Sequence, residues 1–387
     1  MATTPTRTHP NQRAHELLPT PDHDEAARQG FVQALKAHIA TRVSPGVREV
    51  YEHRAAPRWA ADHGGAEPAD RHEIRWALQG DVYYQLWSSV RRSSQHLLWA
   101  SVSDSVTRQA GELANRAEAT AGRAGGSLRL DPDLEIPWYN AEVDIHCMPG
   151  GYRGEYAPGD VAAGALYDQG VFVYAMGQMG PLNDDYGQSV VANYLRAQHP
   201  GFAPRRILDV GCTVGNATLP YVDAFPDAEV HAIDLGAPVL RYAHARAEAL
   251  GRAVHFSQQN AERTDFPDGH FDLIVSHIVL HEMSPAALRR MLAECHRLLA
   301  PGGLMIHADF PGYAGVDPLT QAMIDWDTWN NHEPLWGPMR SMDLSAEAAG
   351  AGFGAGAVSE EIVPTTRILQ TGKQARQGQL WLLVGRR

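Results

Sequence analysis

Cysteine is scarce in this sequence. Its 387 residues include three cysteines, Cys147, Cys212 and Cys295. Cysteines so few and so far apart cannot form the disulfide framework that stabilises small secreted proteins. No two of them have the close spacing of a zinc-finger pair, so neither a disulfide scaffold nor a zinc finger organises this chain.

Positive charge and long apolar runs are also lacking. The chain has 33 lysines and arginines against 45 aspartates and glutamates, a formal net charge of −12. A surface this acidic is unsuited to duplex DNA or an anionic membrane, because phosphate groups are bound by clustered positive charge. No run approaches the roughly 18 apolar residues of a membrane-spanning helix, and the first residues lack the apolar core of a signal peptide. We therefore expect a soluble, cytoplasmic globular protein that binds neither nucleic acid nor membrane.

The periodicity of apolar residues divides the chain into four parts. Residues 1–24 lack periodicity and are predicted to be a mobile tail. Residues 25–125 follow the helical period and are predicted to form a helical domain. Residues 126–183 are rich in glycine, proline, tyrosine and methionine, and we expect an ordered connector that helps to cap the active site. The last part, residues 184–387, contains an insertion at about 311–345 that is expected to cover the substrate.

Short apolar strands alternate with amphipathic helices from residue 184 onward. The strands are expected at residues 205–211, 228–235, 253–259, 271–277, 303–310, 356–363 and 378–387. Helices follow the first, second and fourth of them, which is the pattern of parallel β-α-β units. The sequence therefore predicts an α/β fold with a doubly wound, mostly parallel seven-stranded sheet, preceded by the mainly helical N-terminal domain.

A glycine-rich turn follows the first of these strands and carries Asp209, Gly211 and Gly215. Glycines in such a turn allow backbone N–H groups to approach a ligand at the start of a helix. Asp234 ends the second strand, where a carboxylate can accept hydrogen bonds from both hydroxyls of a ribose. Asn260–Ala261 follows the third strand, where an amide side chain can contact an adenine edge. Together these features predict a nucleotide-type site at the carboxyl ends of the strands.

Residues 205–310 resemble the class I S-adenosylmethionine-dependent methyltransferases, in particular their small-molecule branch. The matching segments are RRILDVGCTVG, AIDL, QNAERTDFPDGHFDLIVSHIVLHEM and LAPGGLMI. One position departs from the family pattern, because Thr213 stands where a glycine is usual and narrows the room beside the ribose and the methionine. The resemblance implies S-adenosylmethionine as the cofactor and the Rossmann-like methyltransferase fold.

The resemblance also implies which residues bind the cofactor. They lie in the glycine-rich turn, at the ends of the second, third and fourth strands, and before the first helix of the sheet domain, a segment that covers the methionine end in this family. They are Asp209, Gly211, Cys212, Thr213, Gly215, Asp234, Leu235, Asn260, Ala261, His277, Tyr174 and Gln178. A nicotinamide site is disfavoured, because the spacing of Gly211 and Gly215 is not the GxGxxG fingerprint.

Two histidines after the fourth strand, His277 and His281, are four residues apart and share a face if this segment is helical. His281 as general base and Glu282 as orienting carboxylate are the catalytic candidates. The alternative is that they only line the cofactor pocket, because methyl transfer can proceed by proximity alone. A metal site made from His277, His281 and His307 or Asp309 is a further alternative. Paired histidines without a placed third ligand are usually not ligands, so no metal is expected.

The acceptor pocket is expected to be built outside these motifs. A largely apolar pocket for a small molecule uses aromatic side chains and a few amides. Two segments supply them, the loop after residue 146 and the insertion after the fifth strand. The candidates are Tyr152, Tyr156, Trp326, Trp329, Asn330 and His332. The alternative is that these side chains are ordinary packing, which for any single tryptophan is the better interpretation.

These features predict an S-adenosylmethionine-dependent methyltransferase that acts on a small organic molecule, in secondary metabolism, by in-line methyl transfer. Nucleic-acid methyltransferases of this fold tend to carry an acceptor motif such as Asn-Pro-Pro-Tyr after the fourth strand, where this sequence reads SHIV. A homodimer through the N-terminal helices is also expected. Two alternatives stay open: an enzyme that uses the bound cofactor for cyclisation, decarboxylation or hydroxylation, and a non-catalytic partner subunit, which Thr213 would allow.

Overall fold

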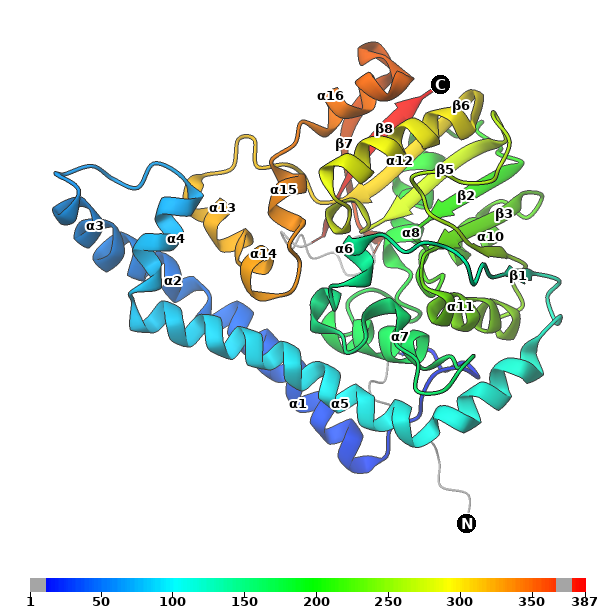
Figure 1. Cartoon of the computed structure of the whole chain (residues 1–387), viewed down its shortest axis with the longest axis horizontal. Helices are drawn as coiled ribbons and strands as arrows, with labels where there is room; N and C mark the ends of the chain where they lie inside the picture. The colour runs from blue at the N-terminus through cyan, green and yellow to red at the C-terminus, as the bar shows by residue number, and fades with distance from the viewer. Residues whose placement is uncertain (1–11, 367–377) are drawn as a thin grey trace.

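The computed structural model describes residues 12–366 and 378–387 (Figure 1). These residues form an eight-stranded sheet with the order β1-β4-β3-β2-β5-β6-β8-β7. Strands β1 to β6 pair in parallel, and β8 runs antiparallel between β6 and β7. The strands are β1 (Ser127–Arg129), β2 (Arg206–Val210), β3 (Glu229–Asp234), β4 (His255–Gln258), β5 (Phe271–His277), β6 (Leu299–Asp309), β7 (Val358–Pro364) and β8 (Gln379–Arg386). The predicted α/β fold with a mostly parallel sheet is confirmed.

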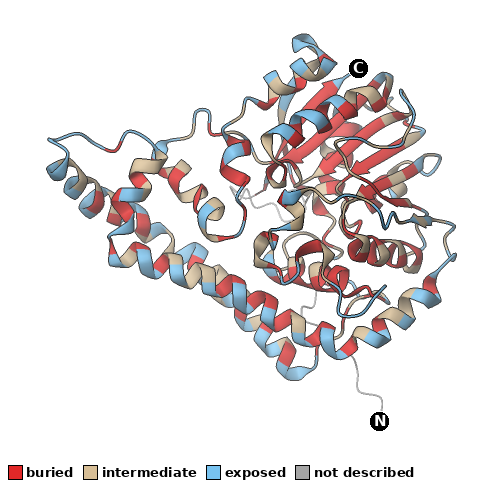
Figure 2. Ribbon diagram, viewed as in Figure 1, coloured by how far each residue is buried: buried red, intermediate tan, exposed pale blue. Residues whose placement is uncertain are grey.

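Apolar runs explain why the central strands form where they do. In β2 the four residues from Ile207 to Val210 are all buried, and β5 and β8 show similar unbroken burial. Strands covered by helices on both faces have such continuous apolar sequences. Figure 2 shows the sheet as the most buried part of the fold. The seven predicted strands correspond to β2 through β8.

The eighth strand, β1, was not predicted and lies at the edge of the sheet beside β4. It comes from residues 126–183, which we expected to be an ordered connector. Three residues are too few to show the alternation of a strand. Its position depends on distant contacts, because the Glu248 carboxylate accepts hydrogen bonds from the Ala124 N–H at 2.5 Å and the Gly126 N–H at 2.7 Å.

Helices cover both faces of the sheet. One face packs against α8, α10 and α11, and the other against α12, α15 and α16. These helices are α8 (Asp185–Ser189), α9 (Arg196–Gln198), α10 (Leu219–Ala224), α11 (Ala237–Ala249), α12 (Pro285–Leu298), α15 (Trp336–Arg340) and α16 (Leu344–Ala348). Single π-helical turns continue two of them at Val190–Leu195 and Ala349–Phe353, and a 3₁₀ turn at Ala355–Ala357 precedes β7.

The N-terminal half is helical, as the sequence predicts. Its helices are α1 (His23–His38), α2 (Pro45–Val50), α3 (Ala56–Asp62), α4 (Arg71–Gln79), α5 (Val82–Thr120), α6 (Trp138–Ala141) and α7 (Ala162–Tyr174), with π turns at Ile39–Val43 and Tyr51–Ala55. The longest is α5, with 39 residues, which begins where the Asp81 carboxylate accepts a hydrogen bond from the Tyr83 N–H. Neither α5 nor any other helix of the described residues has the length and apolarity needed to cross a membrane.

One hydrophobic core joins the N-terminal helices to the sheet domain. It contains Val102 and Leu113 of α5, residues of α7, and Val239 of α11. In Figure 1, α7 lies between α5 and the helices of the sheet. The core therefore crosses the boundary that the sequence suggests near residue 125.

The same core corrects the expectation of a mobile tail at residues 1–24. Leu17 is fully buried in it, and the Arg13 N–H donates to the Pro181 carbonyl at 2.9 Å. Residues 12–22 are therefore a packed segment that leads into α1, while residues 1–11 lie outside the described part of the chain. A single leucine without periodic neighbours gives no sign in the sequence of the surface on which it packs.

A buried ion pair lies at the centre of this junction. Asp168 of α7 accepts hydrogen bonds from Arg246 Nε at 3.1 Å and from the Tyr242 hydroxyl at 3.0 Å, both on α11. The Nε2 atom of His15 lies 3.1 Å from the same carboxylate, and the Asn183 amide donates to it at 3.0 Å. Arg246 and Asp168 are each 2% exposed or less. The contacts of this one carboxylate therefore connect four separate segments of the chain.

The insertion after β6 folds onto the N-terminal helices. It contains α13 (Pro318–Ile324) and α14 (Trp326–Asn330), which lie beside α4 and α5 (Figure 1). Trp326 is 2% exposed, and its ring centroid is 5.6 Å from that of Trp87 in α5. The indole N–H of Trp326 donates to the Ser88 hydroxyl at 2.8 Å. This tryptophan is thus part of a second core rather than of a pocket.

Candidate functional site

A cleft lies at the carboxyl ends of β2, β3, β4 and β5, where open α/β sheets bind ligands. Nine of the residues singled out in the sequence line it. They are Tyr152, Gly211, Thr213, Asp234, Leu235, Asn260, Ala261, His277 and Glu282. They come from separate parts of the chain, because each follows the end of a strand or lies in the loop before α7. The parallel sheet brings these strand ends to one edge.

Asp234 is placed at the middle of this cleft by its own backbone surroundings. Its Oδ2 atom accepts a hydrogen bond from the Thr213 N–H at 2.9 Å, and its Oδ1 atom accepts one from the Gly236 N–H at 2.9 Å. Burial raises the pKa of Asp234 to about 6, although these backbone hydrogen bonds lower it. Each carboxylate oxygen has room for a further hydrogen bond, so the group can accept two hydroxyl donors at once.

The turn after β2 has the backbone conformation that its glycines require. Gly211 has a φ of +70°, and a Cβ atom there would lie 2.7 Å from a methyl group of Val279. Thr213 also has a positive φ, +48°, which explains why a glycine is usual at this position. Its backbone N–H nevertheless reaches Asp234, so the threonine leaves this turn intact.

Three predicted cofactor residues support the turn from beneath and do not line the cleft. Asp209 is 1% exposed, and its carboxylate accepts a hydrogen bond from the Thr218 hydroxyl at 2.5 Å. Cys212 is buried, and its backbone N–H donates to the Ile233 carbonyl at 3.0 Å. Gly215 has a φ of +71° at the start of the following turns. These residues shape the loop without facing a ligand.

Tyr174 and Gln178 do not line the cleft either. Tyr174 is 44% exposed, and the Lys36 ammonium lies 4.8 Å from its ring centroid. Tyr139 and Tyr167 take the position that we expected for it, and both line the cleft. The Tyr174 ring centroid lies 6.4 Å from that of His146, but Tyr174 itself does not line the cleft.

The loop before α7 contributes a histidine that the sequence did not single out as a site residue. His146 lines the cleft, and its Nε2 atom lies 3.2 Å from Glu282 Oε1. The Tyr152 hydroxyl donates to the same oxygen at 2.7 Å. The His146 Nδ1 atom lies 2.9 Å from Glu333 Oε1. Burial lowers the pKa of His146, but Glu333 and Glu282 outweigh it, so its pKa is well above the ordinary value.

His281 lies behind the cleft. It is 1% exposed, and with Glu282 and Glu333 it lines a small adjoining hollow. Its Nδ1 atom is 2.8 Å from Asp309 Oδ1, so Asp309, and not the predicted Glu282, is the carboxylate that orients it. Burial lowers the pKa of His281. The Asp309 carboxylate and the nearby glutamates raise this pKa by more than burial lowers it, so the pKa of His281 is above its ordinary value.

In the metal-ligand set that the sequence suggested, His281 and Asp309 lie together, but His277 and His307 have other partners. His277 is 3.1 Å from the Tyr221 hydroxyl, and His307 is 2.7 Å from the Ser276 hydroxyl. Burial lowers the pKa of His307 to about 4. Both histidines are engaged inside the sheet domain, at a distance from the hollow beside His281. The positions of His277 on β5 and His307 on β6 decide where the two side chains point, and the spacing of the residues along the sequence does not reveal this.

Five of the six predicted acceptor residues lie outside the cleft, and only Tyr152 lines it. Trp326 is core, as described above. Trp329 is exposed, and the Arg75 guanidinium lies 4.1 Å from its ring centroid. Tyr156 is 54% exposed, and His332 lies 3.0 Å from Arg92. The first part of the insertion packs on the N-terminal helices through its apolar residues, and its later part reaches the hollow beside the cleft through Glu333.

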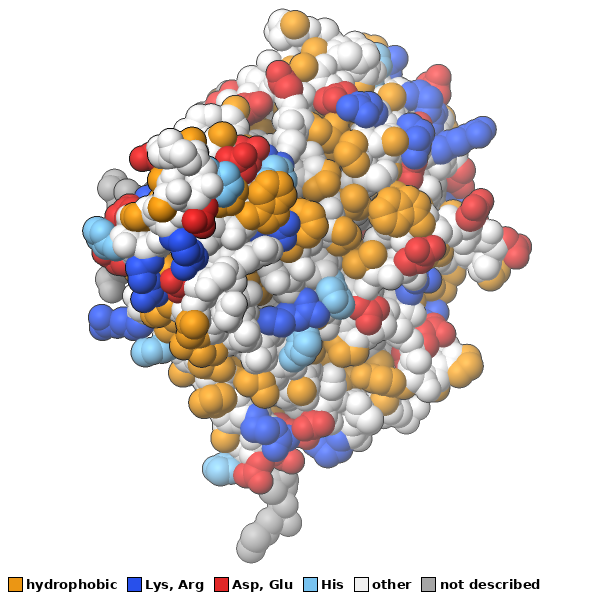
Figure 3. Space-filling view, turned by 60° about the vertical axis from the view of Figure 1, so that its left-hand side comes forward, with side chains coloured by type: hydrophobic (Ala, Val, Ile, Leu, Met, Phe, Trp, Pro, Cys, Tyr) orange, Lys and Arg blue, Asp and Glu red, His pale blue; other side chains and the backbone are white. Residues whose placement is uncertain are grey.

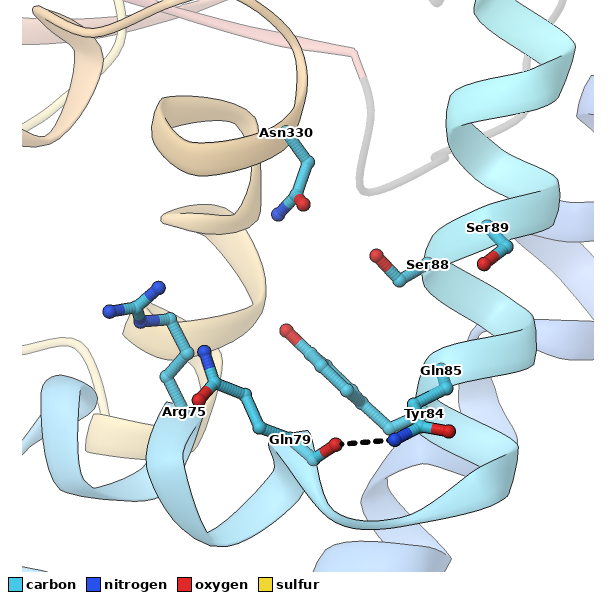
Figure 4. Close-up of a pocket in the computed structure, with 7 residues that line it drawn as sticks. All are labelled: Arg75, Gln79, Tyr84, Gln85, Ser88, Ser89 and Asn330. Atoms are coloured by element: carbon cyan, nitrogen blue, oxygen red, sulfur yellow. Dashed lines mark hydrogen bonds between the residues drawn. The ribbon is translucent and has the colours of Figure 1, made fainter.

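The fifth of these residues, Asn330, borders a separate pocket between α4, α5 and α14 (Figure 4). Its neighbours there are polar side chains, and the Gln85 amide donates to the Gln79 carbonyl at 2.9 Å. This pocket lies among the N-terminal helices and not at the carboxyl ends of the strands. It is therefore not the acceptor side of the cleft.

Part of the sheet domain is similar to known proteins. The family model described as a methyltransferase domain matches residues 207–303. A demethylmenaquinone methyltransferase of Thermus thermophilus is 38% identical over 109 residues, which are 28% of this chain and 49% of that protein. A malonyl-[acyl-carrier protein] O-methyltransferase of Methylococcus capsulatus is 30% identical over 172 residues, 44% of this chain and 58% of that protein. The chain thus spans about half the length of these curated relatives.

One solved structure that is similar to part of this chain is phosphoethanolamine N-methyltransferase 2 of Haemonchus contortus in complex with S-adenosyl-L-methionine. It is 16% identical, and the match covers 57% of this chain and 56% of that one with a TM-score of 0.39. The range matched by the methyltransferase family model, residues 207–303, contains the glycine-rich turn, Asp234 and Asn260–Ala261. The two curated relatives are named for different acceptors, a menaquinone precursor and an acyl carrier protein.

Proposed function

Because the chain contains a class I S-adenosylmethionine-dependent methyltransferase domain, we propose that it transfers the methyl group of S-adenosylmethionine to a small organic acceptor by in-line displacement. The observation that carries this proposal is the Asp234 carboxylate. It faces the cleft with both oxygens held by backbone N–H groups, beside a glycine turn that leaves no room for a side chain.

The residues of the cleft fit this cofactor. Asp234 would accept hydrogen bonds from the two ribose hydroxyls. Leu235 and Ala261 border one side of the cleft and offer apolar contact to the adenine, and Asn260 offers an amide to its edge. The turn at Gly211 lies at the other side, where backbone N–H groups can face the methionine carboxylate.

The bound cofactor supplies a sulfonium-activated methyl group. The chain has to hold the acceptor in line with it and keep water out, because proximity and alignment provide much of the rate enhancement. Tyr139, Tyr152 and Tyr167 line the cleft for this purpose. Glu282 fixes the position of the Tyr152 side chain, because it accepts a hydrogen bond of 2.7 Å from the Tyr152 hydroxyl.

Glu282 is the predicted catalytic residue that can contact the acceptor, since it lines the cleft. His281 does not line the cleft, so we propose that it is a positioning residue that acts through its neighbours. A direct general-base role for His281 would require an acceptor in the adjoining hollow. Of the two predicted catalytic residues, the Glu282 carboxylate therefore faces the cleft, and the His281 imidazole supports its neighbours from behind the cleft.

The proposal includes a small acceptor, a role in secondary metabolism, a cytoplasmic location and a homodimer. The face shown in Figure 3 supports a small acceptor, because basic and acidic side chains are interspersed there and do not gather in one basic patch. Three free cysteines favour a reducing compartment. Exposed Phe31, Leu86 and Leu97 on the N-terminal helices favour self-association.

Product analysis tests the proposed reaction. The purified chain is incubated with S-adenosylmethionine and a panel of small hydroxyl, amine and thiol acceptors. We expect one S-adenosylhomocysteine for each methylated product, measured by mass spectrometry. Conversion of an acceptor without S-adenosylhomocysteine would indicate cyclisation, decarboxylation or hydroxylation instead. Failure to bind the cofactor in calorimetry would leave a non-catalytic partner subunit.

Cofactor affinity is expected to fall as the pH drops below 6. The pKa of Asp234 is raised to about 6 by burial, and only the ionised carboxylate can accept hydrogen bonds from both ribose hydroxyls. Affinity is therefore full above pH 7 and declines by about tenfold for each unit below the pKa. Titration calorimetry at pH 5 and pH 7.5 should differ by about tenfold, and Asp234→Asn should remove this difference. An equal affinity at both pH values would contradict the role of Asp234.

A further inference from the structure

We propose that His146, His281 and Glu282 form a binding site for a divalent transition-metal cation at the inner end of the cofactor cleft. One ligand atom from each of these side chains lies within 4.8 Å of the other two. The site goes beyond the proposed function, because methyl transfer from a sulfonium requires no metal. The three residues come from the loop before α7 and from the 3₁₀ turn at Leu280–Glu282.

The hydrogen bonds of the two histidines turn the same atom of each ring inward. His281 Nδ1 is 2.8 Å from Asp309, and His146 Nδ1 is 2.9 Å from Glu333. Each imidazole therefore has a carboxylate on its Nδ1 side, which leaves its Nε2 atom to face Glu282 and the centre of the cluster. Metal-binding histidines are oriented in this way, by a carboxylate that accepts the proton of the other ring nitrogen.

Two buried polar atoms at the centre of the cluster have no hydrogen-bond partner within the described residues. They are His281 Nε2 and Glu333 Oε2, which lie 3.9 Å apart. His281 is 1% exposed and Glu333 is 4% exposed, so water does not reach them freely. A buried polar atom without a partner is costly. A cation bonded to His281 Nε2 satisfies that atom, and the nearby Glu333 carboxylate helps to balance the charge of the cation.

The charge of the cluster also favours a cation. Three carboxylates, Glu282, Glu333 and Asp309, surround the two imidazoles. Buried carboxylates need a positive partner, because their transfer out of water is unfavourable. A protonated His146, held between Glu282 and Glu333, is the competing partner. A divalent cation would balance two carboxylates in place of that proton.

The ligand types indicate which cation fits. Two imidazoles and one carboxylate suit Zn²⁺, Fe²⁺ or Mn²⁺ better than Mg²⁺ or Ca²⁺, which prefer oxygen ligands. Three protein ligands leave a coordination position for another molecule. Here that position faces the cleft, because His146 and Glu282 both line it. An acceptor hydroxyl or thiol bound there would lose its proton more readily.

The test is a titration of the chelator-treated full chain with Zn²⁺ alone, without S-adenosylmethionine. We expect one equivalent to bind in calorimetry. His146→Gln and Glu282→Gln should each weaken it by at least the roughly 10–100-fold that the loss of an outer-shell partner costs. His53→Gln is the matched control, because His53 also pairs with a glutamate, Glu49 at 3.4 Å, but is exposed. This control should bind Zn²⁺ like the parent chain.

A second measurement does not depend on any variant. Co²⁺ added to the parent chain should give the visible absorption of a four- or five-coordinate site, which competes with Zn²⁺. The proposal is overturned if the parent chain binds no equivalent of either cation, as expected for a protonated His146, or if both variants bind like the control. Zn²⁺ binding without S-adenosylmethionine binding would keep the metal site and defeat the proposed function. The reverse result would defeat the metal site alone.

Discussion

Replacement of Asp234 by alanine is expected to weaken S-adenosylmethionine binding by about a hundredfold or more. The carboxylate is placed to accept hydrogen bonds from two ribose hydroxyls, and hydrogen bonds to a charged group contribute about 1.5–3 kcal/mol each. Loss of both amounts to at least about 3 kcal/mol, which corresponds to about two powers of ten in affinity. Titration calorimetry with the purified variant measures this loss directly.

The folding of this variant is expected to be retained. Burial raises the pKa of Asp234 to about 6, so the ionised carboxylate opposes folding of the free protein at neutral pH and its removal relieves that cost. Asp223→Ala is a suitable control, because Asp223 is a half-exposed carboxylate that pairs with Arg252 away from the cleft. A folded Asp234→Ala protein that binds the cofactor as tightly as this control would refute the assignment of the second motif.

Replacement of Asp168 by alanine is expected to lower the free energy of unfolding by about 3–5 kcal/mol. The variant leaves Arg246 buried without its charged partner, and such uncompensated buried charges are strongly destabilising. Arg246 and its neighbours hold the pKa of Asp168 far below its usual range, despite the opposing effect of burial. The contribution is therefore present above about pH 4 and is lost only in strong acid. Urea denaturation followed by circular dichroism measures it.

An exposed ion pair in the same helices provides the comparison for Asp168. Asp104 of α5 pairs with Arg28 of α1 at 2.9 Å, and both side chains are more than half exposed. Asp104→Ala is expected to change the free energy of unfolding by less than about 1 kcal/mol. If Asp168→Ala were no more harmful than Asp104→Ala, the junction between the N-terminal helices and the sheet domain would not depend on this carboxylate.

The strands and the cofactor side of the cleft were predictable because their signals are local. Asp234 ends an apolar strand, and Gly211 follows another, so a short window of sequence contains both the element and its functional residue. The parallel sheet then brings the strand ends together without further information. Only the edge strand β1, with three residues, was too short for this reasoning.

The acceptor side was not predictable in the same way. His146 and Glu282 are 136 residues apart, and His146 has a φ of +56° in a glycine-rich loop without periodicity. The composition of the insertion suggested a pocket, yet Trp326 fills a space between α5 and α13. Which surface an aromatic cluster packs against is decided by tertiary contacts, and a spacing pattern along the chain does not contain them.

The unbroken helix α5 restricts how the molecule can open. At about 1.5 Å per residue its 39 residues extend for about 58 Å. Trp87, near its start, packs on Trp326 of the insertion, while Leu113, near its end, belongs to the core shared with α7 and α11. A rod fixed at both ends cannot act as a hinge between them. Any opening of the cleft therefore has to come from its loops, and one of these contains His146, which lines the cleft and has a positive φ angle.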